Sequence, residues 1–313
     1  MLTMLRRKSV IFCFPVVVMC LFLSSSALAE ARPPAGDKQL VIGLIPEINI
    51  FEQRKRYKPL LKYISEKIDV PVRMKIYDSY FKVIESLRDG SADMAFVGSL
   101  NYVIADSVAR TEVIVRPEWE DGVSTYSGLI FVRKGSSMTA DPATWKGKKM
   151  ALVHEFTTAG DLSQRYYMAE RGFLNPEKLL KEIDYEGSHD AAVMMVLKGE
   201  ADIGGAKDLV FKRLANENRE VRDNLVILAE SDRVPSNGLV VSDSVDEEIK
   251  TKLKEILLSM DKDETGRSVL AGFRAKRFLD TEKKDYGPVY SMMESLGKNA
   301  KDYFDKYSQK ELR

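Results

Sequence analysis

Continuous apolar runs alternate with stretches whose apolar residues recur at helical spacing. Residues 40–45 are apolar but for one glycine and are followed by a proline, which is typical of a strand buried in a parallel sheet. Residues 51–68 have the helical spacing, residues 72–76 alternate like a strand, and a second helix is expected from Asp78 or Ser79 to its C-cap at Gly90. This alternation predicts α/β layers with parallel sheets.

The pattern contains an internal repeat. Residues 90–95, G-S-A-D-M-A, close a helix and open a strand, and residues 199–204, G-E-A-D-I-G, do the same later in the chain. Each of these strands then runs into a polar loop, at 98–102 and at 205–208. Chance is the alternative explanation, but the order of the elements also matches. Two similar units predict two lobes, each with its own sheet.

Two further strand patterns, at 126–132 and 237–241, flank the middle of the chain, where two hinge crossings would belong. We therefore expect residues 30–127 and 237–313 to form the first lobe and residues 128–236 the second. The sequence S-V-D-E from Ser244 predicts a capping box that opens a helix. The highly charged tail, residues 301–313, predicts a helix end in solvent.

The N-terminus predicts export. Three cations at 6–8 precede an apolar run at 10–23, and an Ala-x-Ala end at Ala29 completes the pattern of a secretory signal peptide, residues 1–29. The apolar run is shorter than the roughly 20 residues that a membrane span needs. Met19 precedes Cys20 where a lipid-anchored protein would have a small residue, which argues against a lipid anchor. We expect a periplasmic protein.

Composition removes several chemistries. Both cysteines, Cys13 and Cys20, lie within the signal peptide, so the mature chain has no thiol or disulfide. The only histidines are His154 and His189, which excludes a multi-histidine metal site. Without the signal peptide, 45 Lys and Arg face 47 Asp and Glu, so nucleic acid is not an expected partner. No Gly-x-Ser-x-Gly elbow or P-loop is present, and we predict a non-enzyme without cofactor or metal.

The most informative stretch is residues 150–171, in which a strand pattern leads through Thr157, Thr158, Ala159 and Gly160 into a helix. The first amides of a helix have no partner within it, the helix dipole is positive there, and the two hydroxyls add donors. Such a turn can bind an anion. The alternative is that Thr157 or Thr158 only caps the helix.

Other loops that follow strands would share one crevice with this turn, because ligands of open α/β sheets bind beyond the carboxyl ends of the strands. They are rich in hydroxyls and amides, with Tyr126 at the hinge, and favour a small oxyanion held by hydrogen bonds. His189, at a helix start, is either a capping or surface residue or a donor to the anion. Lys207 and Asp208 are either a cleft pair or a surface pair, and we expect His154 to be structural.

Taken together, several stretches resemble one known family. They are residues 40–67, beginning L-V-I-G-L-I-P-E-I-N-I-F, and residues 90–102, 126–134, 189–208 and 225–280, the last with V-P-S-N-G and L-S-M-D. The chain resembles the phosphate/phosphite/phosphonate-binding proteins of ABC transporters. These are exported type II periplasmic binding proteins. The resemblance implies an α/β fold of two lobes with a hinge between two sheets and a ligand clamped between them.

The resemblance also implies site residues. Residues 157–160 occupy the place of the family's Ser-Thr-Ser-Gly-like turn, with Ala159 where a hydroxyl is common. The ligand-touching histidine falls on His189 and the first-lobe loop on residues 99–102. Asp208 or Glu47 is a candidate for reading the amine of an aminophosphonate, although neither clearly occupies that place, which slightly favours phosphate, phosphite or a simple phosphonate. The candidate ligand-binding residues are Ser99, Asn101, Tyr102, Tyr126, Thr157, Thr158, Gly160, His189 and Asp208.

The function implied is that of a solute-binding protein. It would clamp a small phosphorus oxyanion, deliver it to an ABC transporter permease in the inner membrane, and act as a monomer. One alternative is a sensing subunit that presents the same closed form to a membrane histidine kinase or another receptor. A second is an enzyme on this fold, such as the thiaminase-like proteins, but their nucleophile is a cysteine and the mature chain has none.

Overall fold

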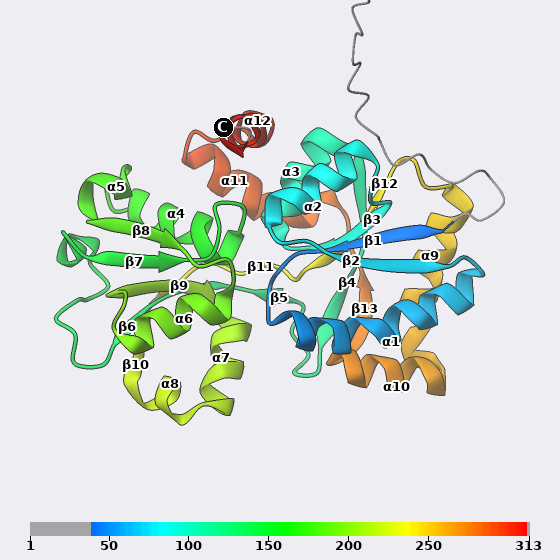
Figure 1. The fold of residues 1–313 in the computed structure, drawn as a ribbon, viewed down its shortest axis with the longest axis horizontal. Coiled ribbons are helices and arrows are strands. Elements are labelled where there is room, and N and C mark those ends of the chain that lie inside the picture. The colour runs from blue at the N-terminus through cyan, green and yellow to red at the C-terminus, as the bar shows by residue number, and fades with distance from the viewer. Residues whose placement is uncertain (1–38, 312–313) are drawn as a thin grey trace, which may run out of the picture. The chain divides into compact units, whose positions relative to one another are not determined.

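The structure is a computed structural model that describes residues 39–311, with side chains up to residue 309 (Figure 1). The predicted signal peptide, residues 1–29, lies outside the described residues. Among the described helices, none has the length and apolar character needed to cross a membrane. The described chain contains two large sheets and a two-stranded connection.

The first sheet has six strands in the order β13-β4-β12-β3-β1-β2. The three strands at one end, β2, β1 and β3, are parallel, whereas β12, β4 and β13 are antiparallel to their neighbours. The strands are β1 (Leu40–Leu44), β2 (Val72–Ile76), β3 (Met94–Val97), β4 (Thr111–Trp119), β12 (Gly238–Ser242) and β13 (Ala275–Asp280). The helices of this part are α1 (Ile50–Ile68), α2 (Tyr80–Asp89), α3 (Ser99–Ala109), α9 (Glu247–Ser259) and α10 (Glu264–Phe273), with short turns η3 (Met260–Lys262) and η4 (Lys283–Tyr286).

The second sheet has five strands in the order β10-β6-β9-β7-β8. Here β8, β7 and β9 are parallel, and β6 and β10 are antiparallel to their neighbours. The strands are β6 (Gly128–Arg133), β7 (Lys149–Leu152), β8 (Glu182–Tyr185), β9 (Ile203–Lys207) and β10 (Leu225–Glu230). The helices are α4 (Ser163–Ala169), α5 (Pro176–Leu179), α6 (His189–Lys198), α7 (Asp208–Glu217) and α8 (Arg219–Asn224), with turns η1 (Pro142–Trp145) and η2 (Thr158–Leu162).

Both sheets are therefore mixed, where the sequence predicted parallel ones. The difference arises at the connection between them, in which β5 (Thr125–Tyr126) and β11 (Val234–Pro235) pair antiparallel. The chain passes through this pair directly into β6 and β12, without the helical crossover that parallel neighbours need. The predicted strand 126–132 is accordingly broken at Ser127. We use the predicted boundaries, 30–127 with 237–313 and 128–236, as definitions of the first and second lobes.

The strand–helix–strand core of the internal repeat is confirmed, but the polar loops expected at 98–102 and 205–208 are not: α3 begins at Ser99, and β9 runs to Lys207, directly before α7. Helices α2 and α6 are both ten residues long, and each ends at a glycine of positive φ, 77° at Gly90 and 82° at Gly199. After each glycine an aspartate turns back to the first strand of its unit: Asp93 accepts a hydrogen bond from an amide of β1 at 2.8 Å, and Asp202 from an amide of β7 at 3.0 Å. The Gly-x-x-Asp spacing therefore closes the same strand–helix–strand unit twice.

Two predictions about helix ends were wrong. The helix expected from Ser244 begins at Glu247, because Asp246 is its N-cap and accepts the amide of Glu248 at 2.9 Å. The charged C-terminal stretch forms α12 (Ala300–Glu311), which follows α11 (Gly287–Ser295), yet its Phe304 is fully buried. The ring of Phe304 stacks on Phe81 with centroids 4.9 Å apart. The rings of Tyr303, Phe304 and Tyr307 pack against Phe81 and Phe156, so one face of α12 is aromatic and is not in solvent.

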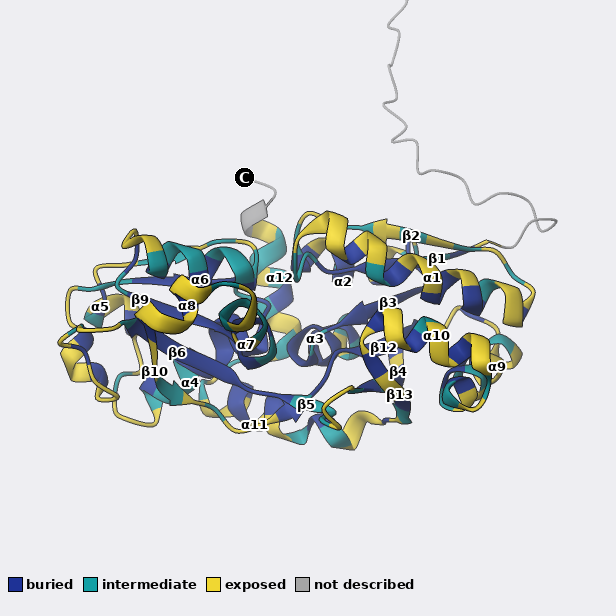
Figure 2. Cartoon of the chain, turned by 90° about the horizontal axis from the view of Figure 1, so that it is seen from below, coloured by how far each residue is buried: buried dark blue, intermediate teal, exposed yellow. Residues whose placement is uncertain are grey.

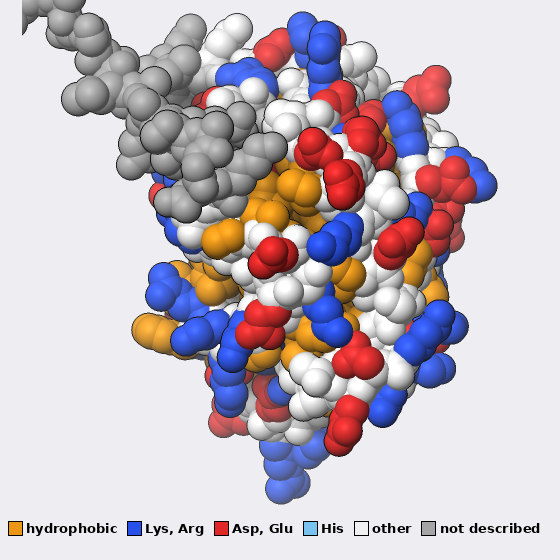
Figure 3. All heavy atoms as spheres, turned by 90° about the vertical axis from the view of Figure 1, so that its right-hand side faces the viewer, with side chains coloured by type: hydrophobic (Ala, Val, Ile, Leu, Met, Phe, Trp, Pro, Cys, Tyr) orange, Lys and Arg blue, Asp and Glu red, His pale blue; other side chains and the backbone are white. Residues whose placement is uncertain are grey.

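The strands and the inner faces of the helices are mostly buried, and most charged side chains lie on the surface. The strands are mostly buried, and exposed positions gather on the outer faces of the helices (Figure 2). On the face shown in Figure 3, cations and carboxylates are interspersed, and neither sign forms a continuous field. This distribution agrees with the near-balanced composition.

Candidate ligand-binding site

The predicted anion turn links β7 to α4 through a π-helical turn, η2 (Thr158–Leu162). Its closing bond runs from the amide of Ser163 to the carbonyl of Thr158. The hydroxyl of Thr157 donates to the carbonyl of His154 at 2.8 Å, which fixes the entry to the turn. The first amides of η2 have no acceptor within the helix, as at any helix start.

Gly160 shapes this turn by close packing. Its carbonyl accepts a hydrogen bond from the amide of Val153 at 2.9 Å. A Cβ added at Gly160 would lie 2.5 Å from the Cβ of Val153, so only glycine lets the turn lie this close to the end of β7. Gly160 does not line the cavity described below.

A second helix start, that of α3 in the first lobe, faces this turn. The amide of Leu100 donates to the hydroxyl of Thr158 at 2.9 Å and so joins the lobes. The side chain of Asn101 is 1% exposed, and its Nδ2 has no hydrogen-bond partner among the described residues. Ser99 donates its hydroxyl to the carbonyl of Pro235 at 2.7 Å and accepts the hydroxyl of Tyr126 at 3.2 Å.

A small cavity lies where these elements meet. The space open to water in it is about 20 Å³, room for roughly one water molecule. Five of the nine predicted site residues line it: Asn101, Tyr126, Thr157, Thr158 and His189. The other lining residues are Ile45, Glu47, Tyr80, Gly98, Ala159, Lys207 and Asn237. Ser99 does not line the cavity, but it accepts the hydrogen bond from Tyr126, which does.

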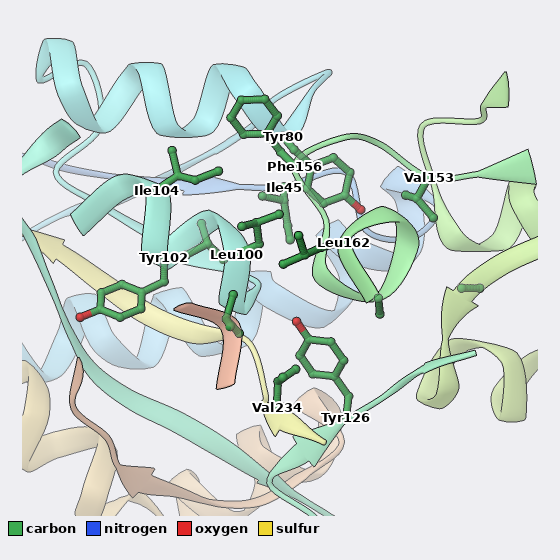
Figure 4. Close-up of a cluster of buried hydrophobic side chains, with 14 of the residues drawn as sticks. Ile45, Tyr80, Leu100, Tyr102, Ile104, Tyr126, Val153, Phe156, Leu162 and Val234 are labelled. Atoms are coloured by element: carbon green, nitrogen blue, oxygen red, sulfur yellow. The ribbon is translucent and has the colours of Figure 1, made fainter. Parts of the chain in front are cut away.

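Tyr102 and Asp208 have other surroundings. The ring of Tyr102 lies 4.5 Å from that of Tyr286, and in Figure 4 its side chain extends away from Tyr126 and Leu162. Asp208, fully buried at the start of α7, accepts the amide of Ser127 at 3.1 Å. Its other oxygen contacts two cations, Lys212 at 3.1 Å and Arg233 at 3.4 Å. Asp208 therefore anchors the chain at the lobe connection.

His189 is held as a neutral ring. Its Nδ1 accepts a hydrogen bond from the backbone amide of Lys207 at 3.1 Å, which leaves Nε2–H as the ring's remaining donor. Burial lowers the pKa of His189 to about 4, against an opposing effect of Glu47 and with a smaller contribution from Lys207. At neutral pH, His189 can donate to an anion but adds no charge.

Glu47 and Lys207 are possible cleft residues from the sequence but are not among the nine candidates, and the sequence indicates no role for Asn237. The structure brings the three together: Lys207 Nζ lies 2.6 Å from Glu47 Oε1 and 3.0 Å from Asn237 Oδ1. Burial alone would raise the pKa of Glu47, but the Lys207 ammonium outweighs it and the pKa is lowered. Asn237 directly precedes β12, and this position was the sequence feature that could have indicated it. The pairing of β12 with β3 sets Gly238 beside Val97 and so brings Asn237 to the end of β3.

The chemistry of the lining is that of recognition by hydrogen bonds. Hydroxyls, amides and a neutral imidazole provide donors, and Lys207 and Glu47 offset each other's charge. Within residues 39–311, no cluster of three or more His, Cys, Asp or Glu side chains could hold a metal ion. These groups suit a small oxyanion, because buried donors gain most from an acceptor that satisfies them.

Comparison with known proteins identifies the family. Residues 42–286 match the family model of the phosphonate periplasmic substrate-binding proteins of ABC transporters. A probable phosphite-binding protein of an ABC transporter from Prochlorococcus marinus is 24% identical over 272 residues, covering 83% of this chain and 91% of that protein.

Solved structures show the same fold. A binding component of an ABC phosphonate transporter from Pseudomonas aeruginosa superposes with a TM-score of 0.75 at 20% identity, over 82% of this chain and 85% of the other. A Prochlorococcus marinus protein in complex with methylphosphonate gives 0.74 at 23%, over 84% and 99%. The fold is thus the two-lobe type II periplasmic binding protein fold, as predicted. It serves here in a substrate-binding transporter component rather than an enzyme, and the chain belongs to the family of phosphonate-binding periplasmic substrate-binding proteins of ABC transporters.

Proposed function

We propose that this protein is exported to the periplasm, clamps a small phosphorus oxyanion between its lobes and delivers it to an ABC permease in the inner membrane. The candidate cargoes are phosphonate, phosphite and phosphate. Membership of the family supports this proposal. So do a relative described as phosphite-binding and a neighbour in complex with methylphosphonate.

The observation that carries the proposal is the unpaired donor of Asn101. A buried amide without an acceptor is destabilising, and Asn101 Nδ2 lies in the lining of the cavity, 1% exposed. It belongs to the first lobe, whereas Thr158 and His189 bring donors from the second. An oxyanion has several acceptor oxygens and can satisfy donors of both lobes at once.

Ligand entry requires the lobes to separate. The space open to water is about 20 Å³, too small for a tetrahedral oxyanion. Opening would break the Leu100–Thr158 bond across the cleft. An oxyanion bound between the lobes would then favour reclosure, since a ligand shifts a two-state equilibrium by its differential affinity for the two states. The permease would recognise this closed form.

Thermal unfolding of ligand-stripped protein tests the proposal. The protein is purified after export, unfolded and refolded without ligand, and scanned against phosphate, phosphite, methylphosphonate, sulfate and several amino acids. Ligand at about 100 times its Kd should add about 2.7 kcal/mol, a shift of a few degrees. A shift with a phosphorus anion supports the proposal. A shift only with sulfate or an amino acid would leave a two-lobe binding protein but contradict a phosphorus cargo.

Asn101→Ala provides the matched variant. It removes the unpaired donor and should weaken binding of the phosphorus anion by about tenfold. Wild-type affinity in this variant would remove the main support for the site.

Addition of loaded protein to the cognate permease and ATPase in vesicles should stimulate ATP hydrolysis. Stimulation of a histidine kinase in place of the ATPase would favour sensing.

A further inference from the structure

The cavity holds a buried cation whose partner is a carboxylate of the protein itself. Lys207 is 3% exposed, and its Nζ lies 4.4 Å from the centre of the Tyr126 ring. Its ammonium donates to Glu47 at 2.6 Å and to the Asn237 side-chain oxygen at 3.0 Å. Asn237 in turn donates its Nδ2 to the second oxygen of Glu47 at 2.8 Å. One carboxylate thus satisfies a matched pair of donors, an ammonium and an amide.

This arrangement joins the two lobes. Lys207 is the last residue of β9 in the second lobe, whereas Glu47 lies between β1 and α1 in the first. When the lobes separate, the pair separates and both groups are hydrated. When they close again, Lys207 must find a negative partner, because an unpaired buried ammonium is strongly destabilising. That partner is either Glu47 or a group that arrives with the ligand.

We propose that the preferred ligand is a short phosphonocarboxylate, whose carboxylate replaces Glu47 on Lys207 and Asn237 while its phosphonate takes the donors of Thr158, His189 and Asn101. The inference rests on the proposed function and names the substrate class of that site. The ligand's carboxylate would occupy the position that the Glu47 carboxylate has now, and it would accept hydrogen bonds from the same two donors, Lys207 and Asn237.

A displaced Glu47 side chain has a place to go. A second hollow of about 450 Å³ begins at the next two residues, Ile48 and Asn49. Its lining includes four cations, Lys55, Arg56, Arg213 and Arg274, and three carboxylates, Glu52, Asp190 and Glu217. The Glu47 carboxylate can therefore leave the cavity for a polar hollow whose cations outnumber its carboxylates by one.

The same geometry disfavours a ligand with an amine. An ammonium group entering the cavity would meet the like charge of Lys207 at short range. Glu47, the only carboxylate among the described residues that line the cavity, is already bound to Lys207. Asp208, the other candidate for reading an amine, uses its oxygens at Ser127, Lys212 and Arg233. The substituent that fits is acidic.

Three ligands of similar size separate these cases: ethylphosphonate, 2-aminoethylphosphonate and 3-phosphonopropionate. Titration calorimetry with the exported, ligand-stripped protein should give 3-phosphonopropionate at least about tenfold tighter binding than ethylphosphonate. We expect 2-aminoethylphosphonate to bind more weakly than either. Lys207→Gln should abolish the preference for the carboxylate but keep ethylphosphonate binding. Lys212→Gln, a matched change at an exposed lysine paired with Asp208, should leave the order unchanged.

Each outcome decides a different point. Equal affinity for ethylphosphonate and 3-phosphonopropionate, or tighter binding of 2-aminoethylphosphonate, overturns the inference and leaves the proposed function standing. Failure of every phosphorus compound to bind contradicts the proposed function itself, and the inference with it. If Lys207→Gln does not fold, the ligand series with the wild-type protein still decides. Glu47→Gln then provides the second variant, which should bind 3-phosphonopropionate more tightly because its neutral amide competes less for Lys207.

Discussion

The backbone amide of Leu100 donates to the hydroxyl of Thr158 across the cleft, at 2.9 Å. The amide belongs to the start of α3 in the first lobe, and the hydroxyl to the turn that precedes α4 in the second. The oxygen of this side chain accepts from the opposite lobe, and its hydrogen remains available to an acceptor such as the proposed oxyanion.

Thr158→Ala tests this double role. Closure of the variant would bury the Leu100 amide without an acceptor and would remove one donor to the oxyanion. The loss should be about 1–3 kcal/mol in binding free energy, or about ten- to a hundredfold in Kd for methylphosphonate measured by calorimetry. Thr158→Ser keeps the hydroxyl and should bind nearly as the wild type. An alanine variant with wild-type Kd would show that Thr158 does not contribute to closure on the ligand.

Acid should destabilise the protein through His189. Its pKa falls from the ordinary value of 6.5 to about 4 because the folded protein buries the ring. Between these values the unfolded chain binds more protons than the folded one, so stability is full above pH 6.5 and falls as the pH drops toward 4. The loss amounts to about 3 kcal/mol.

Urea unfolding at several pH values from 7 to 5 measures this slope, and His189→Gln provides the comparison. The glutamine variant should be less stable at pH 7 and should lose less stability on acidification. Glu47 affects the pH dependence of stability mainly below pH 4.5, because its pKa is lowered and the stability that it contributes is lost only there. Parallel curves for the two proteins between pH 7 and 5 would contradict a neutral, buried His189.

The C-terminal helix should contribute to the stability of the whole fold. Phe304 is fully buried, stacked on Phe81, and its ring centroid lies 6.4 Å from that of Phe156 in the loop before the anion turn. Phe304→Ala should therefore lower the free energy of unfolding by about 3 kcal/mol. Phe51→Ala is the control, because Phe51 is 77% exposed and its loss should change stability by less than about 0.5 kcal/mol. Equal effects of the two substitutions in urea titrations would argue against a packed α12.

Asp208→Asn should affect stability more than binding. The carboxylate is fully buried and holds the amide of Ser127 at the lobe connection. Loss of its charge beside Lys212 and Arg233 should lower the free energy of unfolding by about 1–3 kcal/mol. The Kd for methylphosphonate should change by less than about threefold. A large loss of affinity at unchanged stability would instead place Asp208 in contact with the ligand.

Local signals in the sequence were sufficient for several elements and for the repeated strand–helix–strand unit. The apolar run at 40–45 predicted a buried parallel strand, and β1 lies between β2 and β3, parallel to both. The sequence placed the start of α2 at Asp78 or Ser79 and its end at Gly90, and the caps are Ser79 and Gly90, because capping is decided by a few neighbouring residues. The helix start at residues 157–160 was also predicted, and η2 begins at Thr158, whereas anion binding there stays a prediction.

The sequence by itself thus determined the repeated strand–helix–strand units and several of their caps. Only the tertiary structure decided which side chains share the cavity. Glu47 and Lys207 are 160 positions apart, and Asn237 lies 30 positions beyond Lys207. The register of β12 against β3 and the pairing of β5 with β11 bring them together. The physical reason is that local preferences are set by neighbouring residues, whereas contacts between distant residues are set by strand order and register, which depend on the packing of the whole chain.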